Sequence, residues 1–301
     1  MNIEITVFTP TYNRAYIIEQ LYESLKRQTF RKFEWLVIDD GSSDETEKLF
    51  RKWLKEKNEF TIRYYKKENG GKCRAINYAL DYAQGRLFFV VDSDDYLVED
   101  AIEKILNWEG ILPARDTFCG LAGNLGTSKL YTPNTLFDSE YYDGTLLDRY
   151  EKIDGERAIV FYTEIHKKYK YPEYIDEKFM TEAVVYNRMA NDGYKMRFYN
   201  DIICIYKYQE DGLTKAGNSL FINNPRGYGL WLKEKAIYTK ATLKEKMKMY
   251  YNFSCELSEK YDVKTIAECI DVPAIAIKLL LLIHRVMKVI KKNTQSIEKE
   301  I

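Results

Sequence analysis

Short apolar runs alternate with amphipathic stretches over the first hundred residues, and this alternation constrains the fold more than any other feature. The apolar runs that we expect to form strands are Ile3–Phe8, Phe33–Ile38, Phe60–Tyr65 and Arg86–Val91. Helical periodicity lies between them: after Asn13, a possible N-cap, to about Gln28, around Leu49–Leu54, and over Arg74–Ala83. A repeated order of strand, turn and helix is typical of a mostly parallel sheet, so we predict an α/β fold.

Polar residues follow three of the predicted strands directly. The runs are Asp39-Asp40-Gly41-Ser42-Ser43-Asp44, Asn69-Gly70-Gly71 and Asp92-Ser93-Asp94-Asp95. Ligands of open parallel sheets bind outside the carboxyl ends of the strands, where these runs are expected. A single run of this kind can be a solubilising turn, whereas three at one edge of a sheet indicate a binding site.

The acidic run after the fourth strand suits a divalent cation. Asp92 and Asp94 are close along the chain, and adjacent carboxylates need a cation or strong donors to remain ionised together. Hard oxygen ligands favour Mg²⁺ or Mn²⁺, usually shared with substrate phosphates. The alternative is an acidic loop that caps a helix expected at Val98–Trp108.

Two other groups suit a nucleoside diphosphate. The Asp40 carboxylate could accept a hydrogen bond from a base N–H or a sugar hydroxyl. Asn69-Gly70-Gly71-Lys72 with Arg74 brings backbone N–H groups and cations to a helix N-terminus, an arrangement that binds phosphates. Each group can also be read as an ordinary turn or helix cap.

Four motifs together resemble those of the family 2 glycosyltransferases, in their order and approximate spacing. They are Thr9-Pro10-Thr11-Tyr12-Asn13-Arg14, Asp39-Asp40-Gly41-Ser42-Ser43-Asp44, Asn69-Gly70-Gly71 with Ala75 and Asn77, and Asp92-Ser93-Asp94-Asp95. The resemblance is specific over residues 3–108 and looser to about residue 225. It implies a GT-A fold, a Rossmann-like and mostly parallel sheet flanked by helices. It also implies an inverting, metal-dependent transfer from a nucleotide-sugar.

The resemblance implies a role for each matching residue. Pro10 and Tyr12 would lie along the nucleoside, and Asp40 would contact the base, most often uracil. Asp92 would face the ribose and the metal, and Asp94 would ligate Mn²⁺ or Mg²⁺. The remaining residues of the implied donor site are Asn69, Gly70, Gly71, Arg74 and Ser93.

Inverting transfer also needs a general base on the acceptor side. The family places a carboxylate in a Glu-Asp motif well after the acidic run, and the matching position here is Glu182, with Ala183 where the aspartate is expected. We therefore predict Glu182 as the base. The alternative is a glutamate that favours the first turn of its helix, in which case Asp176 or Glu177 would be the reserve base.

The chain is expected to divide into a catalytic domain and a helical extension. Residues 1–225 would form the catalytic domain, with a donor-binding half over 1–108 and an acceptor half over 109–225. Residues 226–301 hold 15 Lys and Arg and 9 Asp and Glu, a net charge of +6 (15 − 9). Because the whole chain has 46 of each sign, residues 1–225 carry the compensating −6.

The segment 272–292 predicts a strongly apolar helix that begins near Pro273 and carries a stripe of Lys, Arg and His side chains. Such a helix suits an interfacial anchor at an anionic membrane surface. It would equally suit a helix packed on the catalytic domain or on a second copy of the chain. Both interpretations remain open at this point.

Composition restricts the partners and the compartment. The balanced charge argues against wholesale binding of nucleic acid, and two histidines exclude a His-rich metal site. His166 is expected at the surface. Five scattered cysteines without zinc or redox spacing favour a reducing compartment. With no signal peptide or transmembrane run apparent, we expect a cytoplasmic protein, and the basic helix leaves open a peripheral position on the inner face of the membrane.

The function expected from these features is transfer of a sugar from a UDP-sugar to a glycan or lipid-linked acceptor, in surface polysaccharide synthesis. One alternative is a sugar-phosphate nucleotidyltransferase. It would be expected to carry a glycine-rich loop after the first strand, where Thr9–Asn13 has no glycine. Another is a catalytically silent nucleotide-sugar-binding or scaffold protein, an alternative that Ala183 keeps open.

Overall fold

The computed structural model describes residues 3–297 except 114, 208, 210 and 211, and only the backbone of 213, 214 and 289–297. The pattern of contacts divides the chain into two compact units. Unit 1 comprises Met1–Glu173 and Val185–Lys215, and unit 2 comprises Tyr174–Val184 and Ala216–Ile301. The segment Tyr174–Val184, which we expected to belong with the sheet, therefore groups with the C-terminal helices.

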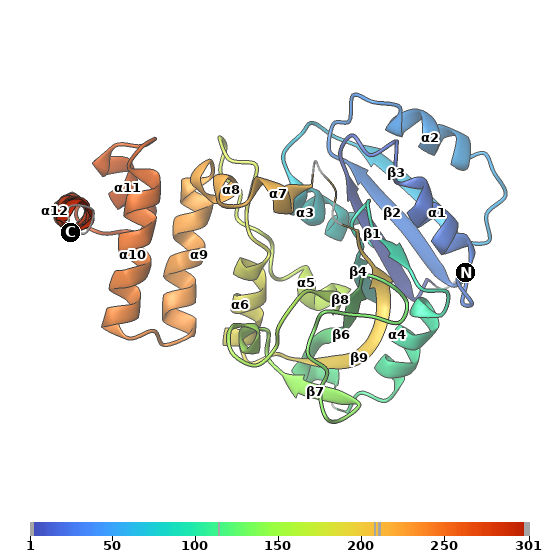
Figure 1. Cartoon of the computed structure of the whole chain (residues 1–301). Helices are drawn as coiled ribbons and strands as arrows, with labels where there is room; N and C mark the ends of the chain where they lie inside the picture. Colours follow the sequence, from blue (N-terminus) through green and yellow to red (C-terminus); the bar gives the residue numbers. More distant parts are fainter. Residues whose placement is uncertain (1–2, 114, 208, 210–211, 298–301) are drawn as a thin grey trace. The chain divides into compact units, whose positions relative to one another are not determined.

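Unit 1 is built on one sheet with the strand order β3-β2-β1-β4-β8-β6-β9-β5, and β7 pairs with β9 (Figure 1). The strands are β1 Ile5–Thr11, β2 Phe33–Asp39, β3 Thr61–Lys66, β4 Leu87–Val90, β5 Tyr96–Leu97, β6 Phe118–Gly126, β7 Tyr141–Gly144, β8 Arg157–Tyr162 and β9 Lys195–Ile205. β3, β2, β1 and β4 run parallel, β8 is antiparallel to β4 and β6, and β6 is parallel to β9. The predicted α/β fold, a sheet with a run of parallel strands flanked by helices, is confirmed.

Helices cover both faces of this sheet (Figure 1). Those of unit 1, with the two that cross its boundary, are α1 Glu19–Lys26, α2 Thr46–Trp53, α3 Lys72–Tyr82, α4 Ala101–Gly110, α5 Thr163–His166, α6 Ala183–Asn191 and α7 Leu213–Ala216. Two 3₁₀ helices, Arg115–Thr117 and Leu146–Tyr150, lie between strands. The buried residues of α1, α2 and α4 join one core with Val7 and Trp35, while α3 contacts β1 and β2 on the other face.

The structure corrects two local predictions. Asn13 does not cap the first helix, because α1 begins only at Glu19; Asn13 has a positive φ of 53° and accepts a hydrogen bond from the Ser43 N–H at 2.8 Å. His166, predicted at the surface, is fully buried. Its ring packs against the aromatic rings of Phe88 and Phe161, from two adjacent strands of the sheet.

Unit 2 contains a helical bundle with its own core. Its further helices are α8 Asn218–Ile222, α9 Pro225–Tyr238, α10 Leu243–Leu257, α11 Val263–Cys269 and α12 Ala274–Ile297. Phe253, Leu257 and Ile266 are fully buried in the bundle core. Pro273 immediately precedes α12, as predicted. Among the residues that the structure describes, no helix combines the length and the apolar character needed to cross a bilayer.

Candidate active site

Four loops follow the carboxyl ends of β1, β2, β3 and β4, and they carry the donor-site residues predicted from the sequence except Pro10, which lies in β1, and Arg74, which lies in α3. The strand register brings the loops to one edge. Thr11 at the end of β1 pairs with Asp39 at the end of β2, and Asp39 pairs with Lys66 at the end of β3. Phe8 of β1 pairs with Val90, the last residue of β4. Polar runs at separate places in the sequence therefore meet in space.

Asp40 joins the second loop to the third. Its side chain is 5% exposed, and its two carboxylate oxygens accept hydrogen bonds from the Gly70 N–H at 2.9 Å and the Gly71 N–H at 2.7 Å. The Asn69 amide and the Lys67 ammonium donate to the same carboxylate. Residues predicted to bind the base and the diphosphate thus form hydrogen bonds with one another. Through these bonds Asp40 fixes the backbone of the glycine loop, residues 69–71.

The backbone around Asp40 is fixed by its neighbours. The buried Asp39 carboxylate accepts hydrogen bonds from the Ser42 N–H at 2.7 Å and from the Tyr64 hydroxyl. Gly41 has a φ of +87°, and a Cβ at this position would lie 2.9 Å from the Asn69 backbone nitrogen. A glycine is therefore required twice over, by the left-handed backbone and by the close approach of the neighbouring loop.

The loop after β1 presents Tyr12 while its own backbone is held in place. The Asn13 N–H donates to the Ser42 Oγ at 2.8 Å, and the Ala15 N–H donates to the Asp44 carboxylate at 2.9 Å. Pro10 is half-buried at the end of β1, whereas the Tyr12 side chain is 48% exposed. An aromatic face held at the strand edge in this way is available for stacking on a planar ligand.

The acidic run after β4 holds three carboxylates, and the first of them, Asp92, pairs with Lys72. The Lys72 ammonium lies 2.8 Å and 2.9 Å from the two oxygens of Asp92, and the Gln20 amide donates to the Asp94 carbonyl at 2.6 Å. Burial, with the Asp92 charge adding to it, raises the pKa of the Asp94 carboxyl. Burial raises the pKa of Asp95 further, to about 9, with the Asp92 and Asp94 charges adding to it.

These carboxylates fit a metal site that is completed by substrate and water better than one in which the protein supplies every ligand. Among the described residues, no three His, Cys, Asp or Glu side chains are grouped as a metal cage. Mg²⁺ and Mn²⁺ are commonly held by one or two protein carboxylates, with substrate phosphates and water completing the shell. The raised pKa values of Asp94 and Asp95 mark a place where additional positive charge would be stabilised.

Arg74 and Ser93 complete the predicted donor set. The Arg74 guanidinium lies 3.6 Å from the Glu173 carboxylate, which also accepts a hydrogen bond from the Asn77 amide at 2.8 Å. The Arg74 stem also lies against Gly70, where a Cβ would come within 2.8 Å of the Arg74 Cδ. Ser93 is buried between the two aspartates of its motif.

The predicted general base and its reserves lie in unit 2. Glu182 is half-buried immediately before α6. Glu177 has a different task, because its carboxylate accepts the Arg226 N–H at 2.7 Å and the Gly227 N–H at 2.8 Å and so caps α9. Asp176 is exposed.

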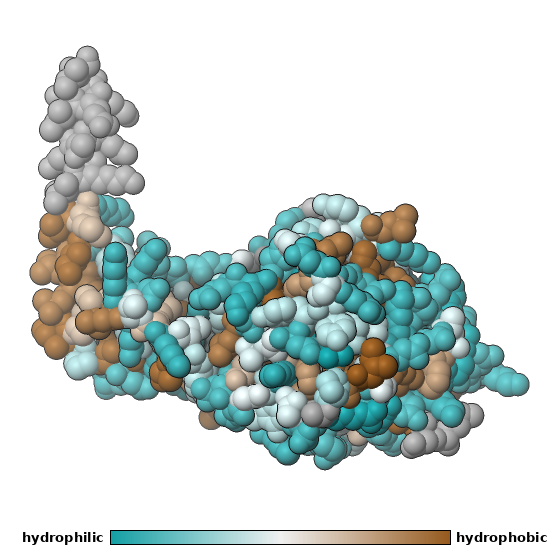
Figure 2. Space-filling view, turned by 90° about the horizontal axis from the view of Figure 1, so that it is seen from below, coloured by the Kyte–Doolittle hydropathy of each residue, from teal (hydrophilic) through white to brown (hydrophobic). Residues whose placement is uncertain are grey.

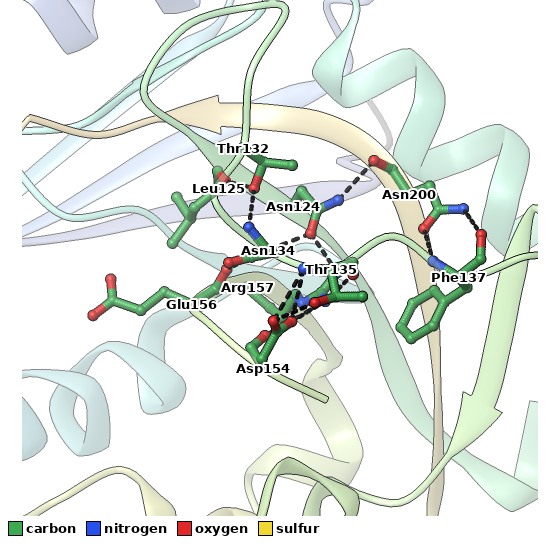
Figure 3. A network of polar contacts seen from close by, with 10 residues as sticks. All are labelled: Asn124, Leu125, Thr132, Asn134, Thr135, Phe137, Asp154, Glu156, Arg157 and Asn200. Carbon is green, nitrogen blue, oxygen red and sulfur yellow. Dashed lines mark hydrogen bonds and ion pairs between the residues drawn. The ribbon is translucent and has the colours of Figure 1, made fainter. Parts of the chain in front are cut away.

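A second polar network, not foreseen from the sequence, lies at the carboxyl end of β6 (Figure 3). The Asn124 amide group accepts hydrogen bonds from Arg157 and from Asn134 at 3.0 Å, and donates to the Asn200 carbonyl at 2.7 Å. The buried Arg157 also packs over the Phe137 ring. This network ties the irregular segment between β6 and β8 to the sheet, which makes its role structural.

The ion-pair partners of the predicted site residues could not be recognised from the sequence. They are Lys67 for Asp40, Lys72 for Asp92 and Glu173 for Arg74. Lys67 and Lys72 flank the glycine loop in the sequence, so two cations around a predicted phosphate loop were the available signal. Glu173 is about a hundred residues away from Arg74, and no local pattern connects the two.

Comparison with known proteins agrees with this geometry. The model of Glycosyl transferase family 2 matches residues 6–158. The minor teichoic acid biosynthesis protein GgaB of Bacillus subtilis is 34% identical over 109 residues, which are 36% of this chain and 12% of GgaB. This chain therefore spans only a small part of the length of that relative.

Two solved structures share the fold at low sequence identity. Residues 1–349 of TarS from S. aureus, in complex with UDP-GlcNAc, align with a TM-score of 0.63 and 16% identity over 94% of this chain and 92% of that one. The mannosyltransferase PcManGT from Pyrobaculum calidifontis, in complex with GDP-Man and Mn²⁺, aligns with a TM-score of 0.56 and 19% identity over 96% and 81% of the two chains.

The family match covers half of the chain and contains all four loops at the carboxyl edge of the sheet. The motifs that it spans are the ones that converge in the structure through Asp40, Lys72 and the acidic run. The chain belongs to glycosyltransferase family 2.

Proposed function

We propose that this glycosyltransferase transfers a sugar, with inversion, from a UDP-sugar to a hydroxyl of a glycan or lipid-linked acceptor in the synthesis of a surface polysaccharide. The observation that carries the proposal is the convergence of Tyr12, Asp40 and the acidic run of Asp92 and Asp94 at one edge of the parallel sheet. The UDP-GlcNAc bound by TarS and the teichoic acid role of GgaB support the donor and the product class.

In this proposal Asp94 and Asp92 hold a divalent cation together with the donor diphosphate. Mn²⁺ or Mg²⁺ bound there would neutralise the charge that develops on the departing nucleotide. The Mn²⁺ in the complex of PcManGT supports a metal, and the raised pKa of Asp94 supports its place. Lys72, which now balances Asp92 at 2.8 Å, would gain a second anionic partner in the diphosphate.

The nucleoside would lie along Pro10 and Tyr12. Asp40 would contact the base only at an edge of its carboxylate, because both of its oxygens already accept hydrogen bonds from the glycine loop. Asp40 would therefore also hold Asn69, Gly70 and Gly71 in the shape that receives the diphosphate. Arg74 and Ser93 would complete the donor site.

Glu182 is the proposed general base. It would accept the proton of the acceptor hydroxyl as that oxygen attacks the anomeric carbon and the nucleotide leaves. Glu177 is a poorer choice, because its carboxylate caps α9 through two backbone N–H groups. Residues 1–225 would then carry the catalytic domain, with residues 226–301 as a helical extension.

Calorimetry of UDP binding and release of UDP from a panel of UDP-sugars test the proposal together. UDP should bind in the presence of Mn²⁺ and bind at least about tenfold more weakly in EDTA. Asp94→Asn should remove this metal effect. Glu182→Gln should keep UDP binding and lower turnover by about 10²–10⁴-fold, the usual contribution of a general base.

The matched control is Asp81→Asn. Asp81 is an exposed carboxylate on α3 that pairs with Lys170 at 2.7 Å, outside the carboxyl edge of the sheet. This variant should bind UDP and turn over like the wild type. Metal-independent UDP binding of equal strength in wild type and Asp94→Asn would remove the metal role. UDP binding without any turnover would indicate a catalytically silent protein.

A further inference from the structure

Helix α12 has two apolar faces, and only one of them is used within unit 2. Ile277 is fully buried, and Leu280 and Leu281 pack against the same core. One turn further on, the His284 Nδ1 lies 2.8 Å from the Tyr251 hydroxyl of α10. These positions follow a spacing of three and four residues, so one side of α12 is packed against α10 and α11.

The opposite side of α12 is equally apolar but exposed. Six large aliphatic or thioether side chains on it are between 49% and 63% exposed: Ile275, Leu279, Leu282, Ile283, Val286 and Met287. Figure 2 shows apolar side chains gathered along this helix. Because isolated surface leucines are common but a continuous apolar stripe three turns long is not, this stripe indicates a binding surface.

The charges around the stripe are of one sign. Lys278 and Arg285 are exposed, are seven residues apart and therefore lie on one flank of the stripe, and Lys288 is exposed as well. Residues 272–297 contain five Lys and Arg and no Asp or Glu. A partner that covers this surface must accept apolar side chains and supply negative charge beside them.

We infer that the outer face of α12 binds the surface of an anionic lipid bilayer. The helix would lie in the interface, with Leu279, Leu282 and Val286 among the acyl chains and Lys278 and Arg285 at the headgroups. It would lie along the bilayer rather than cross it, because its inner face is occupied by protein contacts of Ile277 and His284. This inference does not depend on the donor or on the reaction.

A second copy of the chain suits this surface less well. Pairing two outer faces of α12 would bring the Lys278, Arg285 and Lys288 of one copy near those of the other, without any acidic residue of the helix to compensate. The stripe also lacks Trp and Tyr, which dominate the centres of protein interfaces. A fluid bilayer needs no shape complementarity, and its anionic headgroups provide the missing charge.

Flotation of the full-length protein with lipid vesicles tests the inference. Wild type should float with vesicles of phosphatidylcholine and phosphatidylglycerol in a ratio of about three to one, and hardly at all with phosphatidylcholine alone. The double variant Leu279→Gln with Val286→Gln should lower partitioning by about a hundredfold, because it removes apolar insertion. Both changes are at exposed positions and glutamine favours helix, so the fold should persist, as far-UV circular dichroism would verify.

A charge variant and a matched control complete the experiment. Lys278→Gln with Arg285→Gln should weaken binding to the anionic vesicles by about thirtyfold, and added salt should weaken wild-type binding similarly. The control is Leu130→Gln with Ile175→Gln, which changes side chains that are 96% and 91% exposed outside α12 and should leave flotation unchanged.

Equal flotation of wild type and Leu279→Gln with Val286→Gln would overturn the inference. So would a wild-type dimer in analytical ultracentrifugation that this variant abolishes while no form floats.

Discussion

His166 shows how far a single residue can depart from its average behaviour. Nothing in the local sequence distinguishes it from an exposed histidine on a short helix. The structure buries it completely between Phe88 and Phe161, and neither ring nitrogen has a hydrogen-bond partner among the described residues. It therefore behaves as an aromatic core side chain that happens to be titratable.

The burial of His166 makes the stability of unit 1 sensitive to mild acid. Burial lowers the pKa of His166 from 6.5 to about 3. Between these values the unfolded chain binds a proton that the folded chain does not, so the free energy of unfolding falls as the pH falls below 6.5. The slope is up to about 1.4 kcal/mol per pH unit, or about 2 kcal/mol between pH 7 and pH 5.

His166→Phe should remove this component of the pH dependence and cost little near neutral pH, because no hydrogen bond is lost. Urea unfolding near pH 7 and near pH 5, followed by tryptophan fluorescence, measures both effects. The control is His284→Phe, which removes the second of the two histidines and should leave the slope of unit 1 unchanged. An equally steep loss of stability in acid for His166→Phe would assign the slope to other groups.

For Asp40, the position directly after a strand could be predicted from the sequence, whereas its hydrogen-bond partners could not. Asp40 could be placed at the end of β2 because an apolar run stops there. Its hydrogen bonds to Gly70 and Gly71, thirty residues away, depend on the register of β2 with β3. Side-chain contacts of this kind are set by the sheet, which local sequence patterns do not encode.

At the scale of elements, the contact between the loops after β2 and β3 shapes this part of the carboxyl edge of the sheet. At Gly41 the two loops approach closely: its φ is +87°, and a Cβ at this position would lie 2.9 Å from the Asn69 nitrogen. The alternation of strand and helix predicted both loops, and their polar composition predicted a shared site. The close packing between them could not be predicted, because it depends on a backbone distance.

Gly41→Ala should destabilise unit 1 by two effects, the positive φ and the clash with the neighbouring loop. Gly193→Ala isolates the first effect, since Gly193 has a φ of +92° and no atom lies within 4 Å of its new Cβ. We expect Gly193→Ala to cost about 1 kcal/mol and Gly41→Ala at least about 1 kcal/mol more. Urea unfolding measures both, and equal losses would show that the loops move apart at no cost.

The strands of the first hundred residues and the region between β6 and β9 differ in how well the sequence predicts them. Strands β1 to β4 were predicted within about three residues, because apolar runs end in polar turns there, whereas the two-residue strand β5 was not predicted. The region between β6 and β9 is instead organised by distant polar contacts, such as that between Asn124 and Arg157. These contacts join residues that are far apart in the sequence, so no local pattern predicted the network, and the short strand β7 was not predicted either.

At the scale of the whole molecule, the chain contains separate hydrophobic cores in the sheet and in the helical bundle. The sheet core includes Trp35, Trp53 and Trp108, and the bundle core has Trp231 packed against it. The change of composition near residue 226, from net acidic to net basic, predicted a domain boundary there. It did not anticipate that Tyr174–Val184, which carries the proposed base, would group with the bundle.

Separate cores lead to the expectation that the two units unfold in separate transitions, because each buries its own apolar surface. The variant Trp231→Phe keeps tryptophans only in unit 1, so its fluorescence reports that unit, while far-UV circular dichroism reports both units. In urea the two signals should therefore give different midpoints. UDP with Mn²⁺ at about one hundred times its dissociation constant should stabilise the unfolding of unit 1, seen by fluorescence, by about 2.7 kcal/mol. The unfolding of unit 2, seen only by circular dichroism, should remain nearly unchanged. Fluorescence and circular-dichroism unfolding curves that coincide and shift together would instead show that the two units fold as one cooperative body. The carboxyl edge of the sheet and the helical bundle would then be energetically coupled.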